Sequence, residues 1–185
     1  CAVKNGKSLD TSLGLTLQCG TMHNNRCGDI DPYIIFYLVE SCGMTLEEVK
    51  QMLQTRSGLY GMSGGAGRDL RDVQAAAEAG NEDAELAIRA YCYSIKKYIG
   101  AYAAALNGVD AIVFTAGVGE NDMGMRERIL NGLDYLGVEV DFELNRNCPR
   151  GENVEISKPG SKVKVFVIPT DEELMIAKDT ARLAK

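Results

Sequence analysis

Two short segments in the second half of the chain place glycine or carboxylate residues directly after an apolar run. Residues 117–121 follow the apolar residues 111–114, and residues 170–173 follow the apolar run 163–168. Such runs are typical of strands buried on both faces, and the residues after each run indicate a turn into a helix. Ligands of open parallel sheets bind where strand carboxyl ends meet helix N-termini. The two segments are therefore candidate binding loops.

The first loop reads Gly117, Val118, Gly119, Glu120 and Asn121. Glycine lacks a Cβ, so this loop would let a ligand approach the backbone closely; the alternative is a plain tight turn in which glycine supplies a positive φ. A dinucleotide fingerprint needs a third glycine, and this sequence has Asp122 there. No Gly-Lys-Ser/Thr phosphate loop occurs in the chain. The pattern thus favours close approach to a ligand and argues against an NAD-binding domain.

The second loop carries two adjacent carboxylates, Glu172 and Glu173. Mg²⁺ in proteins is usually held by only one or two carboxylates, so one of them could be a metal ligand. The alternative is structural, because Thr170 and Glu173 have the spacing of a helix capping box. Both can hold at once, with one glutamate for each role.

Arg26 lies in the unpatterned segment 16–28, which we expect to be a loop. A guanidinium is always charged and can fork onto phosphate oxygens, so Arg26 is a candidate for contact with a phosphate group. The alternative is an ordinary surface arginine. His23, three residues earlier, has the same pair of interpretations. Five glycines at positions 58–67 indicate a second flexible or closely packed loop.

The elements expected around these loops alternate between strand and helix, which indicates an α/β fold. Asn5-Gly6 predicts a two-residue hairpin turn. Asp31 and Pro32 predict a cap and first helical residue, and Thr45 with Glu48 predicts a capping box. Predicted helices cover residues 32–43, 46–55, 69–79, 82–106, 123–135 and 170 onward; predicted strands cover 111–114, 138–140 and 163–168; residues 145–160 are predicted to be a loop.

Length and composition bound the possibilities further. The 185 residues suit one domain, or one domain with an appendage. The formal net charge is −6, and no Lys/Arg-rich run favours nucleic acid as a partner. No apolar stretch approaches a membrane span and no signal peptide opens the sequence, so we expect a cytoplasmic protein. Six cysteines without a C-x-x-C pair, and one histidine, indicate reduced thiols rather than a zinc site. The chain begins at Cys1 inside a predicted strand, so we expect it to be part of a longer protein.

Six ordered blocks resemble the acetate kinases over nearly the whole chain. They are residues 4–14, 26–32, 69–72, 96–102, 114–121 and 167–174. The resemblance implies the fold of the actin, hexokinase and Hsp70 superfamily, a ribonuclease H-like ATPase domain with a mixed sheet flanked by helices. It implies that residues 1–185 are the C-terminal nucleotide-binding and dimerisation domain, and that the N-terminal domain is absent.

The same resemblance implies an activity and roles for particular residues. The family transfers phosphate reversibly between ATP and acetate, giving acetyl phosphate and ADP. By position, Arg26 matches the arginine that stabilises the transferring phosphoryl group, and Glu172 matches a ligand of Mg²⁺ (or Mn²⁺). Asp69, Leu70 and Arg71 match residues that contact the adenosine, and residues 117–121 match a second nucleotide loop. The implied partners are ATP or ADP, acetate or acetyl phosphate, and a second copy in a homodimer.

Several questions stay open at this stage. The acyl pocket of the family belongs mainly to the missing half, so a propionate kinase is an alternative, as is a non-catalytic dimerisation or nucleotide-binding module for the isolated chain. Asn24-Asn25 and residues 64–68 depart from the family pattern, so the loops that contain them could differ in shape. The tyrosines of the predicted helix 82–106 could fill the chain's own core or contact a partner. They are Tyr91, Tyr93, Tyr98 and Tyr102.

Overall fold

The computed structural model describes residues 1–184, and the chain divides into two compact units, Cys1–Asn107 and Gly108–Lys185. Helices and strands alternate as expected for an α/β chain, and the sheet of the second unit is mixed. The predicted fold class is confirmed.

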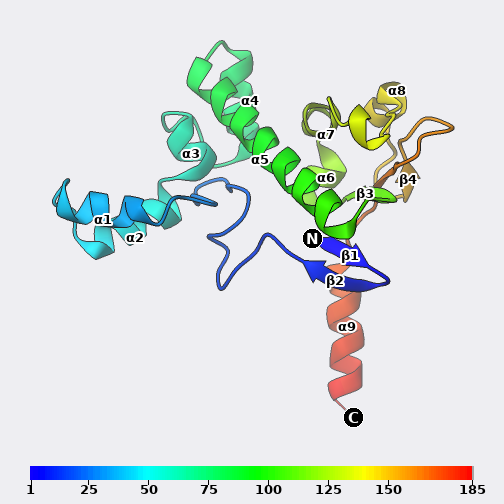
Figure 1. The fold of residues 1–185 in the computed structure, drawn as a ribbon, viewed down its shortest axis with the longest axis horizontal. Coiled ribbons are helices and arrows are strands. Elements are labelled where there is room, and N and C mark those ends of the chain that lie inside the picture. The colour runs from blue at the N-terminus through cyan, green and yellow to red at the C-terminus, as the bar shows by residue number, and fades with distance from the viewer. Residues whose placement is uncertain (185) are drawn as a thin grey trace. The chain divides into compact units, whose positions relative to one another are not determined.

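The first unit is a small hairpin followed by five helices (Figure 1). The hairpin turn is formed by Asn5 and Gly6, whose φ angles of 52° and 72° are those of the predicted two-residue turn. The elements are β1 (Ala2–Lys4), β2 (Lys7–Asp10), α1 (Tyr33–Glu40), α2 (Leu46–Thr55), α3 (Gly58–Met62), α4 (Leu70–Glu78) and α5 (Glu82–Leu106). The ends of α2, α4 and α5 agree with the predicted ranges to within about one residue.

Local side chains explain where these helices begin. The Thr45–Glu48 capping box of α2 is present in full. Asn81 caps α5 by accepting a hydrogen bond from the Ala84 N–H, and Asp69 caps α4. The start of α1 differs from the prediction, because Pro32 takes the capping position and Tyr33 is the first helical residue. Asp31 still contributes, since its carboxylate accepts a hydrogen bond from the Tyr33 N–H at 2.9 Å.

The core of the first unit lies where α3 and α4 pack on α5 (Figure 1). Its buried apolar side chains include Val49 of α2 together with Leu59, Leu70, Val73, Ala84, Ala87, Ile88 and Cys92. By contrast, no residue of α1 is buried, although the sequence predicts an apolar face for this helix. The tyrosines of α5 differ in exposure. Tyr93 is 65% exposed, whereas Tyr91, Tyr98 and Tyr102 are half-buried.

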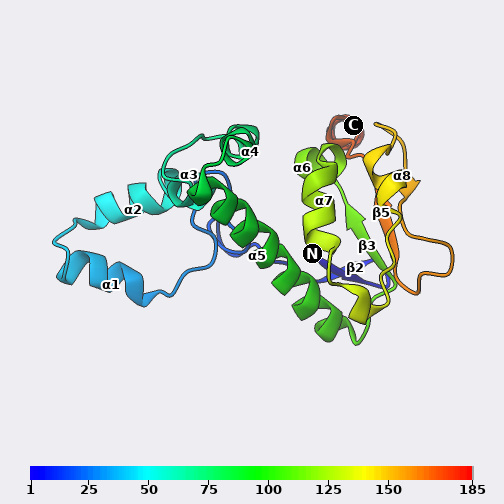
Figure 2. The same ribbon diagram turned by 90° about the horizontal axis from the view of Figure 1, so that it is seen from above.

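The second unit is a three-stranded sheet with helices after its strands (Figure 2). The strand order is β3-β5-β4, in which β3 pairs with β5 in parallel and β4 pairs with β5 in antiparallel fashion. The elements are β3 (Ala111–Phe114), α6 (Ala116–Asn121), α7 (Met123–Leu130), a 3₁₀ turn (Asp134–Leu136), α8 (Phe142–Arg146), β4 (Val154–Glu155), β5 (Lys164–Val167) and α9 (Glu172–Leu183).

Several predictions for the second unit are wrong. The helix predicted over 123–135 ends at Leu130, because Gly132 turns the chain with a φ of 82°. The loop predicted over 145–160 contains β4, and residues 138–140 form only isolated bridges to Val163 and Ser157. Strand β3 is not buried on both faces, since Val113 is 49% exposed while Phe114 is buried. In β5 Val165 and Val167 are buried, as expected for a central strand.

Candidate functional site

The two candidate loops of the second unit leave the sheet at the same edge. Strands β3 and β5 are parallel neighbours, and their last residues, Phe114 and Val167, are paired in register. The Ile168 N–H continues the pairing by donating to the Phe114 carbonyl oxygen at 2.9 Å. Since both strands end here, the polypeptide after each strand is delivered to the carboxyl edge of the sheet, where such folds bind ligands.

The first loop is a short helix rather than the predicted open turn. Residues 117–121 belong to α6, and the positive φ of 58° falls on Ala116 instead of a glycine. The two glycines of α6 differ in the space around them. A Cβ on Gly119 would lie 3.1 Å from the Phe114 carbonyl carbon, so Gly119 allows α6 to pack on β3. A Cβ on Gly117 would meet no atom within 4 Å, so the surface at Gly117 is open to a ligand.

Glu120 joins the first loop to the second. Its carboxylate accepts hydrogen bonds from the Thr170 N–H at 2.8 Å and the Thr170 hydroxyl at 3.0 Å. The hydrogen bond from the Thr170 N–H is the main cause that holds the pKa of Glu120 below its usual value.

The predicted cap on α9 by Thr170 and Glu173 is wrong. Asp171 is the cap, and its carboxylate accepts from the Leu174 N–H at 3.0 Å.

The other residues of α6 complete the loop. The Asn121 side-chain amide donates to the Gly117 carbonyl oxygen at 3.0 Å, which closes the single turn of α6 on itself. Val118 is half-buried. The loop predicted from five residues is thus a compact turn, internally bonded and tied to Thr170.

Glu172 is the first residue of α9 and is exposed. Asp171 and Glu173 flank it, so this turn carries three carboxylates, and their negative charge attracts a cation. Within residues 1–184 no group of three His, Cys, Asp or Glu side chains is arranged to hold a metal ion. A single carboxylate nevertheless fits Mg²⁺, which usually keeps several waters and takes its remaining ligands from substrate phosphates.

In the first unit, a set of backbone hydrogen bonds holds the loop that carries Arg26. The N–H groups of Ser57, Leu59 and Tyr60 donate to the carbonyl oxygens of Asn25, His23 and Asn24 at 3.1, 3.0 and 2.7 Å. Because these bonds use backbone atoms, the departure at Asn24-Asn25 does not alter them. The Arg26 side chain is half-exposed, so its guanidinium remains within reach of a ligand.

Gly58 makes this close packing possible, and sequence reasoning did not single it out. Its φ is +60°, and a Cβ here would lie 2.2 Å from the His23 carbonyl oxygen and 2.6 Å from that of Arg26. The only sequence signal was the cluster of glycines at 58–67. Burial, assisted by the charge of Arg26, lowers the pKa of His23.

Asp69, Leu70 and Arg71 form the start of α4. The Asp69 carboxylate accepts from the Arg71 N–H at 2.9 Å and from its guanidinium at 2.8 and 3.1 Å. These bonds lower the pKa of Asp69 to about 2. The Arg71 side chain is 87% exposed and available to a ligand. The Leu70 side chain is 6% exposed and belongs to the core, so only the Leu70 backbone could contact an adenosine.

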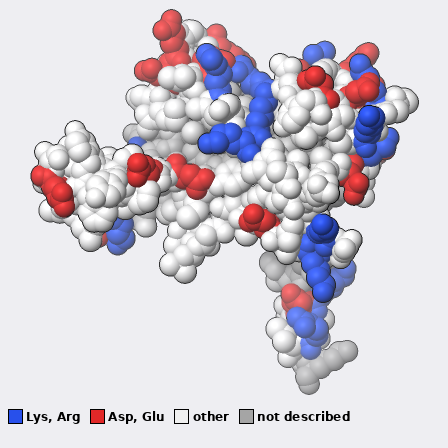
Figure 3. All heavy atoms as spheres, in the orientation of Figure 1, with Lys and Arg blue, Asp and Glu red and all other residues white. Residues whose placement is uncertain are grey.

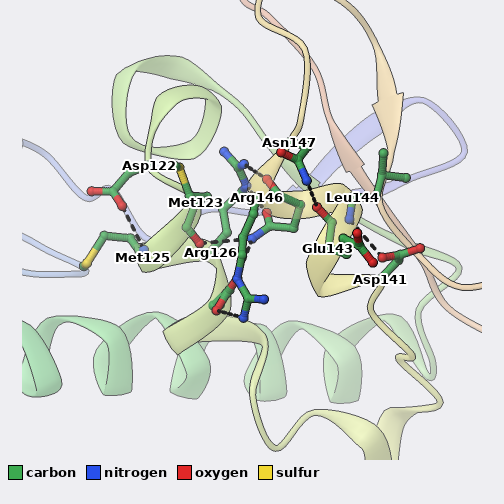
Figure 4. A network of polar contacts seen from close by, with 11 residues as sticks. Asp122, Met123, Met125, Arg126, Asp141, Glu143, Leu144, Arg146 and Asn147 are labelled. Atoms are coloured by element: carbon green, nitrogen blue, oxygen red, sulfur yellow. Dashed lines mark hydrogen bonds and ion pairs between the residues drawn. The ribbon is translucent and has the colours of Figure 1, made fainter.

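A buried arginine of α7 supports the first loop and was also missed. Arg126 is 2% exposed, and its guanidinium donates to the carbonyl oxygens of Gly119 and Glu120, both at 2.9 Å. It also donates to Asn145 of α8. Figure 4 shows Arg126 among the polar side chains of α7 and α8. Nothing in the sequence marks Arg126, because an arginine on a short helix is usually solvated.

On the face drawn in Figure 3, acidic and basic side chains are interspersed, in keeping with the net charge of −6. No helix among residues 1–184 has the length and apolar character required to cross a bilayer.

Comparisons with known proteins agree with this arrangement. The sequence profile of the Acetokinase family matches residues 1–178. Acetate kinase of Clostridium botulinum is 54% identical over 183 residues, and that of Caldicellulosiruptor saccharolyticus is 51% identical. Each alignment covers 99% of this chain, and it covers 45% of the first relative and 46% of the second.

Solved structures give the same result. The acetate kinase of Porphyromonas gingivalis superimposes with a TM-score of 0.91 at 46% identity, over 99% of this chain and 45% of the other. A propionate kinase of Francisella tularensis gives 0.85 at 38% identity, over 95% and 44%. The fold and loops therefore define an α/β domain of the actin/hexokinase-like class. The chain belongs to the acetokinase family, and it spans about half the length of the relatives it matches.

Proposed function

We propose that this chain supplies the nucleotide-binding half of an ATP:acetate phosphotransferase, which interconverts acetate and ATP with acetyl phosphate and ADP. The observation that carries the proposal is the Glu120–Thr170 link, which fastens two loops together at the carboxyl edge of β3 and β5. One loop leaves open space at Gly117, and the other carries Glu172 beside Thr170. Such an edge suits a nucleotide and its metal ion.

The proposed roles follow the chemistry of each side chain. Residues 117–121 contact the nucleotide, and Asp69, Leu70 and Arg71 contact the adenosine, Leu70 through its backbone alone. Arg26 stabilises the phosphoryl group during transfer. Phosphoryl transfer depends on positioning and on neutralising charge rather than on covalent chemistry by the protein. A fixed guanidinium is suited to that purpose because it cannot lose its charge.

Glu172 is the proposed ligand of Mg²⁺ (or Mn²⁺). Its exposed carboxylate lies in an acidic turn two residues after Thr170, so it can meet the metal ion of a metal–nucleotide complex. When bound, the ion supplies charge neutralisation for the phosphates. The protein's own contribution is a single oxygen ligand at a fixed helix start.

Calorimetric titration of Mg·ADP into the chain tests the nucleotide site. We expect saturable 1:1 binding that Gly117→Val abolishes, because the valine side chain would fill the open space while no protein atom lies near its Cβ. Gly124→Val is the matched control, since a Cβ there makes only an ordinary 3.5 Å contact with Asp122. Arg71→Ala should weaken binding. No binding to the folded wild-type chain would contradict an autonomous nucleotide site and would favour a non-catalytic module.

A propionate kinase is the second candidate, supported by the likeness to the Francisella tularensis propionate kinase. The kcat/KM values for acetate and propionate, measured on a full-length protein that contains this chain, distinguish the two. Higher kcat/KM for propionate would contradict the proposed substrate.

A homodimer and a cytoplasmic location also remain predictions. Tyr93 on α5 is the most exposed of the four tyrosines considered for a partner contact. Size-exclusion mass measured against protein concentration tests the dimer. A mass that stays monomeric at all concentrations would contradict it.

A further inference from the structure

Arg126 is buried in the second unit without a carboxylate among its hydrogen-bond partners. Its Nε donates to the Asn145 Oδ1 at 2.7 Å, and one terminal nitrogen donates to the Asn145 carbonyl oxygen at 3.1 Å. The other terminal nitrogen donates to both the Gly119 and Glu120 carbonyl oxygens at 2.9 Å. All four acceptors are neutral oxygens. Placing a cation in such a position is costly, because burial removes its hydration.

The partners of Arg126 lie on two different elements. Gly119 and Glu120 belong to α6, whereas Asn145 belongs to α8 and is completely buried. Asn145 is itself fixed, since its side-chain amide donates to the Met123 carbonyl oxygen at 3.1 Å. The guanidinium therefore connects Asn145, in the interior of the unit, to the last turn of α6.

We propose that Arg126 is a positioning residue that sets the orientation of the loop at residues 117–121 for nucleotide binding. This inference rests on the nucleotide site proposed above. By holding the Gly119 and Glu120 carbonyl groups inward, Arg126 fixes the direction of α6. That direction in turn lets the Glu120 side chain reach Thr170. The open surface at Gly117 and the turn that carries Glu172 are thereby held in one arrangement.

The geometry requires an arginine in particular. Lysine carries the same charge, but its single ammonium nitrogen cannot replace three nitrogens spread over a planar fork. It would have to give up either α6 or Asn145. An apolar residue would leave the Gly119 and Glu120 carbonyl groups without their donor. If the fold needed only side-chain volume at this position, methionine would be enough. If it needed only a positive charge, lysine would be enough.

The test compares Arg126→Lys and Arg126→Met with Arg128→Met, which lies on the same helix at an exposed position. We expect Mg·ADP affinity, measured by calorimetry, to fall about tenfold or more in both Arg126 variants, as when other groups that orient ligand-binding residues are removed. The control should bind like the wild-type chain. Thermal unfolding of each variant establishes that it is folded before it is titrated.

A second readout needs no nucleotide. The carboxyl group of Glu120 is titrated by carbon NMR in the free chain, where Thr170 holds its pKa low. We expect that pKa to rise toward its ordinary value in Arg126→Lys, in which the charge is kept and only the geometry is lost, and to stay unchanged in Arg128→Met.

The outcomes separate the two proposals. If the folded wild-type chain fails to bind Mg·ADP, an autonomous nucleotide site is contradicted, and a rise of the Glu120 pKa in Arg126→Lys would still support positioning by Arg126. If the wild-type chain binds and folded Arg126→Lys binds equally well with an unchanged Glu120 pKa, the positioning role is overturned. If Arg126→Lys binds Mg·ADP like the wild-type chain and Arg126→Met does not, only the charge at position 126 matters. That result also overturns the positioning role.

Discussion

Single residues of the candidate site owe their properties to atoms that lie far away in the sequence. Gly117 and Gly119 are two positions apart and identical in type, yet one faces open space and the other touches the backbone of Phe114. Leu70 and Arg71 are adjacent, yet one side chain fills the core and the other is exposed. The contacts available to a ligand therefore differ sharply between neighbours.

Arg26 is the residue from which we expect the largest effect on catalysis. In a full-length protein that contains this chain, Arg26→Ala should lower kcat by about 10²-fold or more, because a fixed charge aimed at the transferring group is lost. Steady-state kinetics check this value. The backbone bonds of residues 23–25 do not involve the Arg26 side chain, so the unfolding temperature should change little. An unchanged kcat would contradict the assignment.

At the scale of elements, the short helix α3 determines where the Arg26 loop lies. Three consecutive carbonyl oxygens of that loop accept hydrogen bonds from N–H groups at the start of α3 and just before it. The approach is so close that only glycine fits at position 58. Elements that are short and poorly marked in the sequence can therefore fix a functional loop.

Gly58→Ala tests this dependence. We expect the free energy of unfolding to fall by about 2 kcal/mol or more, because a positive φ costs a non-glycine residue about 1 kcal/mol and overpacking adds about 1–3 kcal/mol. Gly43→Ala is the matched control, because Gly43 has a similar φ of +69° but a Cβ there meets nothing within 4 Å. Denaturant unfolding measures both. Equal losses for the two variants would show that the contact with His23 carries no cost.

At the scale of the whole molecule, three groups with lowered pKa values make the fold less stable on acidification. The pKa of His23 is lowered from 6.5, so the folded chain binds fewer protons than the unfolded chain just below that pH. The pKa values of Glu120 and Asp69 are also lowered, the latter to about 2. Each carboxylate stabilises the fold above its unfolded pKa and loses that contribution as the pH falls.

We therefore expect the unfolding temperature to be highest above pH 6.5 and to decline in two stages on acidification. The first stage, below pH 6.5, belongs to His23 and should disappear in His23→Gln. The second, below about pH 4.5, belongs to the carboxylates and should remain. Calorimetric scans between pH 8 and pH 3 measure both stages. A first stage that persists in His23→Gln would contradict the role of His23.

The sequence by itself determined the features that depend on neighbouring residues. The Asn5-Gly6 turn, the Thr45–Glu48 capping box and the long helix α5 were all predicted, because their hydrogen bonds join residues at most four apart. The order of the six blocks identified the family. It also gave the candidate site residues, whose roles remain predictions.

Only the tertiary structure decided how these local pieces support one another. Glu120 meets Thr170 across fifty positions, Arg126 meets Asn145 across nineteen, and Gly58 packs on His23. Strand β4 and the exposed side of β3 likewise depend on which strands pair with β5. Such contacts form because burial of apolar surface brings distant chain segments together. This driving force is non-directional, so local sequence patterns do not specify which polar groups will meet.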